Sequence, residues 1–287
     1  MRATSTDVLL LVDKPAGMSS HDVVALARRA LGTRKVGHGG TLDPFATGLL
    51  VLLAGRGTRL LQFVPAEPKV YEATIRFGSE TDSDDLTGHI VREAPLPAPA
   101  AVLAALPSLT GDLDQLPPAY SAKHVAGERA YEIARRGAAP ELAPARVRVE
   151  RWDVLEQHDA RLVARIACGT GTYIRALARD LGRATGSAAH LESLRRVRVG
   201  PFDVRNATDV EALRAGAPPC HDLVEALGTM PRLQLDADQV RRVRHGMRLP
   251  ASGNDTRVAL LDDEGELIAV ADRDGEWWQP AVVLSVA

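Results

Sequence analysis

Residues 37–50 read Gly37-His38-Gly39-Gly40-Thr41-Leu42-Asp43-Pro44-Phe45-Ala46-Thr47-Gly48-Leu49-Leu50, so a single acid ends a glycine-rich loop and an apolar run follows. Glycine lets a backbone approach a ligand closely. A residue before proline is biased toward an extended conformation, which fixes the carboxylate of Asp43 on the loop. Asp-Pro is also a common turn pair, so these features alone leave a purely structural turn as the default.

Two catalytic interpretations of this loop are weak. A phosphate-binding loop would end in Gly-Lys-Ser/Thr and open a helix, and residues 37–50 do neither. Glycoside hydrolysis usually needs two carboxylates flanking the bond, and the sequence offers no convincing partner for Asp43. A second carboxylate about 5–10 Å from Asp43 would favour that reaction.

The flanking sequence predicts a mixture of strands and helices. Residues 8–12 and 49–54 are short apolar runs typical of buried strands, and residues 70–77 alternate as a half-buried strand does. A helix is expected to begin at Ser19 or Ser20 and to stop at Gly32. Further helices are expected over 126–137, up to about Gly182, and over much of 208–227, and further strands over 146–155, 160–168 and 193–199.

The order of these elements is not a regular alternation of strand and helix. We therefore expect an α+β fold with a central, mostly antiparallel sheet flanked by helices, not a doubly wound parallel sheet. The character of the sequence changes near Gly228, where a short helix and strands at 256–261 and 267–271 follow. The predicted domains are residues 1–228 and a small β-rich domain of residues 229–287.

Composition limits the class of protein. The 287 residues include 45% hydrophobic residues, an ordinary content for a soluble globular protein, and carry a net charge of −2. Nucleic-acid-binding domains are often basic, so the net charge alone argues against RNA. Basic residues cluster, however, at 28–35, 129–136, 146–151, 175–205 and 241–248, and one folded face with a positive field could bind phosphates. From charge alone, solvated faces remain the simpler interpretation.

Other features exclude several classes. The start lacks a signal peptide and no apolar run could span a bilayer, which predicts a cytoplasmic protein with no membrane partner. Cys168 and Cys220 show no ligand or disulfide spacing, and the eight histidines show no zinc motif, so no metal is expected. Nothing indicates an oligomer, and a monomer is the default.

Several blocks in order resemble one family, the TruB family of tRNA pseudouridine-55 synthases. Residues 37–50 resemble its catalytic motif, and residues 11–20 its opening strand and loop. The other matching blocks are residues 69–73, 78–88, 117–122, 127–137, 169–175 and 194–196. Agreement of so many blocks over nearly the whole chain is far more specific than any one glycine motif.

The resemblance implies a role for each matching residue. Asp43 corresponds to the essential aspartate, and Tyr71 to the tyrosine that stacks on the target base and is proposed to help remove its proton. Arg175 corresponds to the arginine that pairs with the aspartate. Tyr173 and Leu194 correspond to residues that line the base pocket. His38, Arg195 and Arg196 are the expected RNA-binding residues.

Physical chemistry supports these roles. A nearby guanidinium favours an ionised carboxylate. Tyr173 and Arg175 point the same way if residues 173–175 are extended and diverge if a helix begins at Tyr173. Without the resemblance, Tyr71 would be interpreted as a core aromatic, Arg175 as a surface arginine and Leu194 as simple core.

The expected activity is isomerisation of uridine to pseudouridine in the T-arm loop of tRNA, at position 55, by base flipping and without a cofactor. An alternative from another class is a tRNA-binding or folding chaperone with the same fold that needs no catalysis. The sequence departs from the family pattern at Lys123-His124, where many members carry an apolar residue and then lysine. Residues 229–287 resemble a shortened PUA-like RNA-binding domain, whose Arg241, Arg242, Arg244 and Arg248 are candidate contacts for the acceptor stem.

Overall fold

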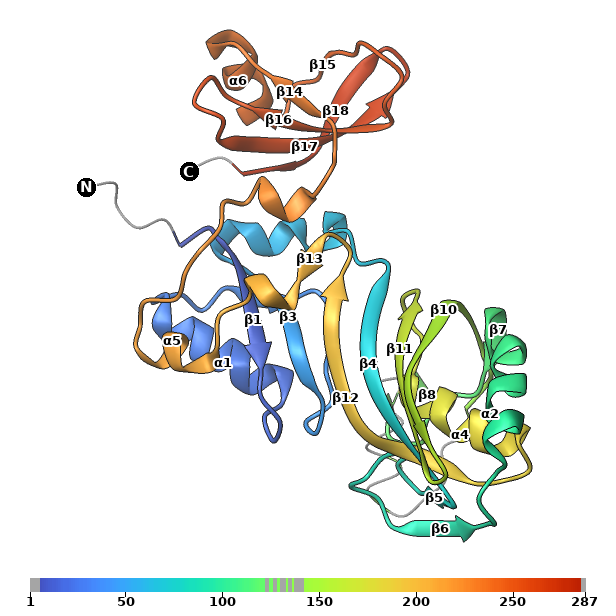
Figure 1. Cartoon of the computed structure of the whole chain (residues 1–287). Helices are drawn as coiled ribbons and strands as arrows, with labels where there is room; N and C mark the ends of the chain where they lie inside the picture. The colour runs from blue at the N-terminus through green and yellow to red at the C-terminus, as the bar shows by residue number, and fades with distance from the viewer. Residues whose placement is uncertain are drawn as a thin grey trace.

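The computed structural model describes residues 6–284 apart from 122–123, 126–127, 130–132, 134–135 and 137–141. It consists of two sheets with helices packed around them (Figure 1). The larger sheet has nine strands in the order β1-β3-β12-β4-β11-β10-β7, with β2 beside β3 and β13 beside β12. All its neighbouring strands are antiparallel except β3 and β12. The expected α+β class and mostly antiparallel sheet are therefore confirmed.

The strands of the larger sheet are β1 (Leu9–Lys14), β2 (Val36–His38), β3 (Thr47–Ala54), β4 (Lys69–Phe77), β7 (Gly111–Gln115), β10 (Ala145–His158), β11 (Arg161–Cys168), β12 (Ala189–Val199) and β13 (Phe202–Asp203). Small hairpins are formed by β5 (Ser79–Thr81) with β6 (Ile90–Glu93), and by β8 (His124–Val125) with β9 (Glu128–Arg129). The strands predicted at 8–12, 49–54, 70–77, 146–155, 160–168 and 193–199 all lie within or overlap these elements.

Helices cover the larger sheet at both ends. Near β1 lie α1 (Ser20–Ala30) and α5 (Val210–Arg214), and near β10 and β7 lie α2 (Pro99–Ala105) and α4 (Ile174–Ala184) (Figure 1). Ser19 caps α1 as expected, because its side chain accepts from the Asp22 N–H while the Asp22 carboxylate accepts from Ser19. One core lies between the sheet and α4, and a second packs α1 and α5 against β1 and β3.

Two helix predictions need correction. Glu128 and Arg129 form a strand within the range 126–137, most of which lies outside the described residues. Over 208–227 the structure has only α5 and a short 3-10 turn at Glu225–Leu227. Helix α5 ends at Arg214 because Gly216 takes a left-handed φ of 74° and two prolines follow it.

A second sheet of five strands forms the C-terminal part of the chain, in the order β14-β16-β17-β18-β15. Its strands are β14 (Arg232–Gln234), β15 (Leu249–Pro250), β16 (Arg257–Leu261), β17 (Leu267–Asp274) and β18 (Trp277–Val283), with α6 (Ala237–Arg244) packed on them. The predicted short helix and two strands are present.

The two sheets meet through a mixed contact. Phe63 and Leu60 pack in one cluster with Val270 and Val282 of the C-terminal sheet. Arg59 donates from Nη1 to the Val283 carbonyl at 2.6 Å. The Arg257 guanidinium lies 4.7 Å from the centroid of the Phe63 ring. Apolar packing, a hydrogen bond from an arginine side chain to a main-chain carbonyl, and a cation–π contact therefore join the C-terminal sheet to the rest of the chain.

Candidate active site at Asp43

The loop that carries Asp43 joins β2 to β3 and is anchored by the start of α1. Ser20 Oγ accepts from the Leu42 N–H at 2.9 Å and donates to the Leu42 carbonyl at 3.1 Å. The Gly17 N–H donates to the Pro44 carbonyl at 2.8 Å. Leu42 is buried in the core under the sheet. These contacts fix the backbone on both sides of Asp43, while its carboxylate stays about one-third exposed at 36%.

Two buried cations bind the backbone of the same loop. Arg196 is 1% exposed and donates to the carbonyls of Leu49 at 2.8 Å, Thr41 at 3.3 Å and Gly40 at 3.0 Å. Lys14 is fully buried and donates to the carbonyls of Met18 at 2.7 Å, Pro15 and Pro44. Burial is the main cause that lowers the pKa of Lys14 to about 8. The backbone of the loop is thus held by two charged side chains that are distant from it in the sequence.

Arg175 faces Asp43 from the first turn of α4. Its Nε lies 3.0 Å from Asp43 Oδ2, and its Nη2 donates to Oδ1 at 3.3 Å. Its Nη1 donates to the Ser83 carbonyl at 2.9 Å and its Nη2 also donates to the Tyr120 carbonyl at 2.8 Å, whereas its Nε makes no hydrogen bond to any described residue. Only 5% of the Arg175 side chain is exposed. A guanidinium held on several sides presents the carboxylate in one orientation.

A second carboxylate shares this guanidinium. Asp85 Oδ2 lies 3.5 Å from Arg175 Nη1, and Asp85 is buried. Its Oδ1 accepts from Ser83 Oγ at 2.8 Å and from both the N–H and Oγ1 of Thr87. These bonds turn Asp85 into the protein interior behind Arg175. A second acid is therefore present beside Arg175, but it is buried and its Oδ1 is engaged in three hydrogen bonds, so it is not free to act as the second carboxylate of a glycosidase.

Tyr71 and Leu194 lie in the core cluster that also contains Leu42. Tyr71 lies on the buried face of β4 and is 7% exposed. In the strand register it lies opposite Arg196 of the neighbouring strand β12. Burial raises the pKa of Tyr71, so the phenol keeps its proton at neutral pH. Leu194, also 7% exposed, lies two residues before Arg196 on the same strand face. The structure thus brings both residues to the loop of Asp43.

Tyr173 occupies the residue before α4 and adopts an extended conformation, with φ −98° and ψ 111°. Its backbone is held twice by Gln115, which accepts from the Tyr173 N–H at 2.9 Å and donates to its carbonyl at 3.1 Å. Burial raises the pKa of Tyr173. The helix begins at Ile174, so only Tyr173 of residues 173–175 is extended, and a common direction for Tyr173 and Arg175 stays a prediction.

The expected RNA-binding residues lie in different environments. His38 ends β2, and its Nδ1 accepts from the Gly40 N–H at 3.3 Å; burial lowers its pKa. Arg195 pairs with Asp13 at 2.6 Å and is partly exposed. Arg196 is buried and bound to the loop, which makes it a support of the loop. An RNA contact by these three residues stays a prediction. Lys123 and the side chain of His124 lie outside the described residues.

Sequence reasoning missed Lys14, Gln115 and Asp85 as members of this site. Lys14 lies in the Asp13-Lys14-Pro15 block, whose sequence predicts only the end of a strand and not a contact with the loop of Asp43. Gln115 and Asp85 carry no local signal. Gln115 contacts Tyr173, which lies 58 residues further along the chain, and Asp85 contacts Arg175, which belongs to a separate element. A three-dimensional arrangement is needed to find them.

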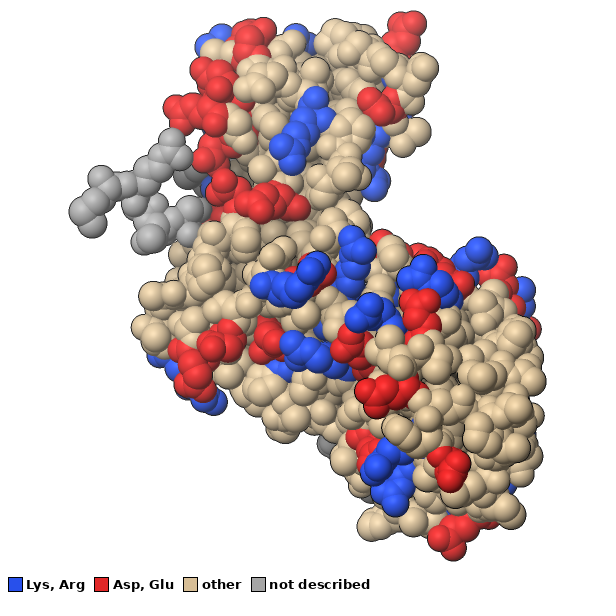
Figure 2. Space-filling view, in the orientation of Figure 1, with Lys and Arg blue, Asp and Glu red and all other residues tan. Residues whose placement is uncertain are grey.

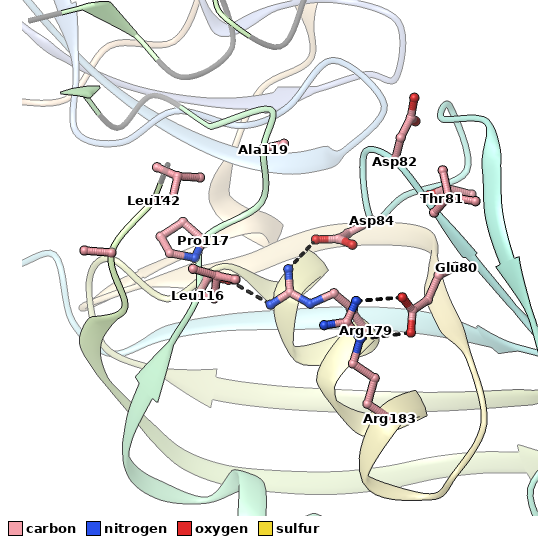
Figure 3. A pocket seen from close by; sticks show the side chains of 12 residues that line it. Glu80, Thr81, Asp82, Asp84, Leu116, Pro117, Ala119, Leu142, Arg179 and Arg183 are labelled. Atoms are coloured by element: carbon pink, nitrogen blue, oxygen red, sulfur yellow. Dashed lines mark hydrogen bonds and ion pairs between the residues drawn. The ribbon is translucent and has the colours of Figure 1, made fainter. Parts of the chain in front are cut away.

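A cavity of about 730 Å³ lies beside this site. Its charged lining is paired internally: Arg179 binds Asp84 at 2.8 Å and the Leu116 carbonyl, and Arg183 binds Glu80 (Figure 3). None of the catalytic, base-pocket or RNA-binding residues predicted from the sequence lines it. The loop at Asp43, not this cavity, gathers those residues, and we therefore place the candidate active site at the loop.

The sheet face visible in Figure 2 mixes both signs of charge. Between neighbouring strands, Arg165 of β11 pairs with Glu72 of β4 at 2.6 Å, and Arg161 of β11 pairs with Glu192 of β12 at 2.6 Å. The clustering of basic residues in the sequence does not produce a uniformly positive surface on this side, because acids on the neighbouring strands neutralise it.

Two features are absent from the part of the chain that the structure describes. No group of three or more His, Cys, Asp or Glu side chains there could hold a metal ion. No helix among these residues is long and apolar enough to cross a membrane.

Family models match three consecutive parts of the chain. Residues 28–174 match "TruB family pseudouridylate synthase (N terminal domain)". Residues 175–217 match "tRNA pseudouridylate synthase B C-terminal domain", and residues 230–285 match "tRNA Pseudouridine synthase II, C terminal". The chain therefore falls within the class of pseudouridylate synthases.

Whole-chain relatives narrow this class. The chain is 44% identical to tRNA pseudouridine synthase B of Thermobifida fusca (strain YX), covering 97% of this chain and 99% of that protein. It is 43% identical to tRNA pseudouridine synthase B of Mycobacterium sp. (strain KMS), covering 97% and 96%. The chain belongs to the TruB family, as the resemblance predicted.

A solved structure supports the fold. The chain in "Structure of H/ACA RNP bound to a substrate RNA containing 2'-deoxyuridine" superposes with a TM-score of 0.72 at 22% identity, over 98% of this chain and 86% of that one. At this identity the likeness concerns the fold, which is thereby confirmed as the one shared with that RNA-bound protein.

Proposed function

We propose that this protein converts uridine to pseudouridine at position 55, in the T-arm loop of tRNA, with Asp43 as the catalytic carboxylate. The observation that carries the proposal is the Asp43–Arg175 pair, in which a buried guanidinium, held by backbone carbonyls on its far side, faces a partly exposed carboxylate. Relatives that cover nearly the whole chain bear the name tRNA pseudouridine synthase B, which supports tRNA as the substrate.

The pocket residues suggest how the base is held. A uridine in a folded loop must leave its stack, at a cost of a few kcal/mol. Stacking on the ring of Tyr71 would return roughly 1–3 kcal/mol of this. Tyr173 and Leu194 would line the pocket, and His38, Arg195 and Arg196 would contribute to RNA binding directly or through the loop. Asp43 would act on the bound nucleotide.

The reaction rearranges one nucleotide without adding or removing atoms. The bond between the sugar and N1 of uracil breaks, the base rotates, and carbon 5 joins the sugar. The proton on carbon 5 leaves, and N1 gains a proton. Since the product is an isomer of the substrate, the proposal requires no cofactor.

We also propose that residues 1–228 form the catalytic domain and residues 229–287 a small PUA-like RNA-binding domain. The separate five-stranded sheet and its own core support this division. The acceptor stem of tRNA is a candidate ligand for the arginines of α6, since Arg241, Arg242 and Arg244 lie on its last turn.

The experiment compares wild type with Asp43→Asn on an unmodified tRNA transcript and maps pseudouridine by position. Wild type should produce it at position 55, and the variant, which retains shape but lacks the charge, should lose at least about a thousandfold in rate, as expected for removal of a group that acts at the reacting atoms. A matched Asp203→Asn variant, at an exposed ion pair with Arg205, should keep full activity.

The outcomes separate the alternatives. No product from wild type on any tRNA would exclude the enzyme and leave a tRNA-binding or folding chaperone. Product at another position would correct the T-arm assignment. Full activity of Asp43→Asn would remove Asp43 from the catalytic role.

A further inference from the structure

Lys69 is a buried lysine that the proposed reaction has not used. It opens β4 and lies on the same strand face as Tyr71, because side chains two residues apart point the same way. Only 9% of Lys69 is exposed. It thus extends the site from Tyr71 to the N-terminal end of β4.

The ammonium of Lys69 is poorly satisfied. Among the described residues, its one hydrogen bond is a long one of 3.5 Å to Thr170 Oγ1, although an ammonium offers three donors. The carboxylate of Glu67 accepts instead from the Thr170 N–H at 2.6 Å. Burial, followed by the charge of Arg196, lowers the pKa of Lys69. A buried cation with spare donors favours the approach of an anion.

A second cation lies close to the same point. A Cβ placed on Gly40 would lie 3.7 Å from Lys69 Nζ and 3.6 Å from Arg196 Nη1. Gly40 carries no side chain, so both cations border the small space that a side chain would occupy there, beside the loop of Asp43. Thr170, on the other side, is exposed. This space is therefore positively charged and lies next to solvent.

We propose that Lys69 binds a phosphate oxygen of the substrate RNA, on a phosphodiester next to the nucleotide that enters the Asp43 site. The proposal rests on the proposed function. Along β4, Lys69 and Tyr71 are separated by about 6.6 Å. A ribose separates a base from its phosphate by a similar span, so a base on Tyr71 brings its phosphate toward Lys69. The missing side chain of Gly40 leaves room for the phosphate. Arg196 adds positive charge there while it keeps its hydrogen bonds to the carbonyls of the loop.

The test measures binding of a T-arm hairpin RNA to Lys69→Met in an Asp43→Asn background, which leaves the RNA unreacted. Removal of one phosphate contact should weaken binding about tenfold near 0.1 M salt, the effect of losing one charge-assisted hydrogen bond. It should also reduce the slope of log affinity against log salt by about 0.7–0.9. Lys69→Arg, which keeps the charge, should retain most of the slope.

Arg214→Met is the matched control, because it also removes one charge, from an exposed ion pair on α5. It should bind with the same salt slope as the background protein. Thermal unfolding of each variant shows that the fold is kept; Met fills a buried position without an unpaired charge.

An unchanged salt slope in a folded Lys69→Met protein would overturn this proposal. The proposed function is judged separately, by pseudouridine formation with the wild-type chain. An active wild type with an unchanged Lys69→Met slope rejects only the phosphate contact, whereas an inactive wild type rejects the function on which it rests.

Discussion

The arginines of the two sheets differ in what they contact. Around the nine-stranded sheet, Arg175, Arg179 and Arg196 are buried and bind carbonyls and carboxylates. In the C-terminal sheet, Arg248 and Arg273 lie 4.9 and 5.2 Å from the rings of Trp277 and Trp278, near the surface. The buried Arg196 and Arg175 hold the backbone and the carboxylate of the Asp43 loop, whereas Arg248 and Arg273 hold no part of that loop and pack on tryptophan rings. The difference predicts a graded set of effects on stability.

The largest effect on stability should come from Gly48→Ala, because a side chain at Gly48 would collide with the backbone of Arg196 on the neighbouring strand. Gly48 has a φ of 103°, and a Cβ there would lie 2.2 Å from the Arg196 carbonyl oxygen. Strain and overlap should lower the free energy of unfolding by roughly 3–5 kcal/mol. Denaturant unfolding measures this. Gly216→Ala is the control: its φ is 74° but nothing lies within 4 Å, so strain alone should cost about 1–2 kcal/mol. Equal losses would show that the strand contact is unimportant.

Arg196→Met should cost about 3 kcal/mol, since several buried carbonyls lose their donor at about 1–3 kcal/mol each while burial of the charge is relieved. Arg273→Met removes a surface arginine that binds the Gly253 carbonyl and should cost less than 1 kcal/mol. Chemical denaturation of both proteins checks the contrast. Similar losses in the two variants would remove the distinction between the two sheets.

Glu80→Gln tests a third environment, a buried acid with partly exposed arginines. Burial by itself would raise the pKa of Glu80, but Arg183 and Arg92 together lower it to about 2. Because the folded pKa lies below the ordinary 4.5, the charge stabilises the fold above about pH 4.5 and this is lost as the pH falls toward 2.

The variant should therefore be less stable than wild type by about 1–3 kcal/mol at pH 7, with the solvent-exposed arginines reducing the effect. The difference should shrink as the pH falls below about 4.5. Unfolding measured between pH 7 and pH 3.5 follows it. Glu192→Gln, at a more exposed pair, should change stability by less than 1 kcal/mol. A difference that does not depend on pH would mean that Glu80 acts by shape and not by charge.

The smallest effect should come from Arg248→Gln, which removes the guanidinium over Trp277. An exposed cation–π contact contributes about 0.5–1 kcal/mol. Thermal unfolding should shift only slightly, with Arg244→Gln on the same domain as a comparison. A loss above 2 kcal/mol would show that this arginine supports the fold as those around Asp43 do.

Much of the fold could be predicted from the sequence because its signals are local. The alternation in residues 70–77 places Tyr71 on the buried face of β4, and Ser19 caps α1. The Asp43 loop was located by its glycines and Pro44. The helices expected over 208–227 were too long, because Gly216 and the two prolines after it outweigh the apolar spacing.

The parts of the site that could not be predicted depend on distant contacts. Nothing in the sequence near Gln115 indicates that its amide holds the backbone of Tyr173. The sequence places Lys69 in a strand but does not predict its environment, because Gly40 and Thr170, which border its ammonium, belong to other parts of the chain. Side-chain burial and satisfied donors are properties of the assembled chain, so they follow from packing and not from local propensity.

The support of the Asp43 loop has a consequence for the order of folding. Arg175 reaches Asp43 across 132 residues, and Arg196 reaches Gly40 across 156. Contacts this remote form only after the chain has closed long loops. A fragment ending before β12 would contain Asp43 but not the arginine that shapes its loop. Enzymatic activity would therefore report completion of the large sheet, and a partly folded chain would remain inactive.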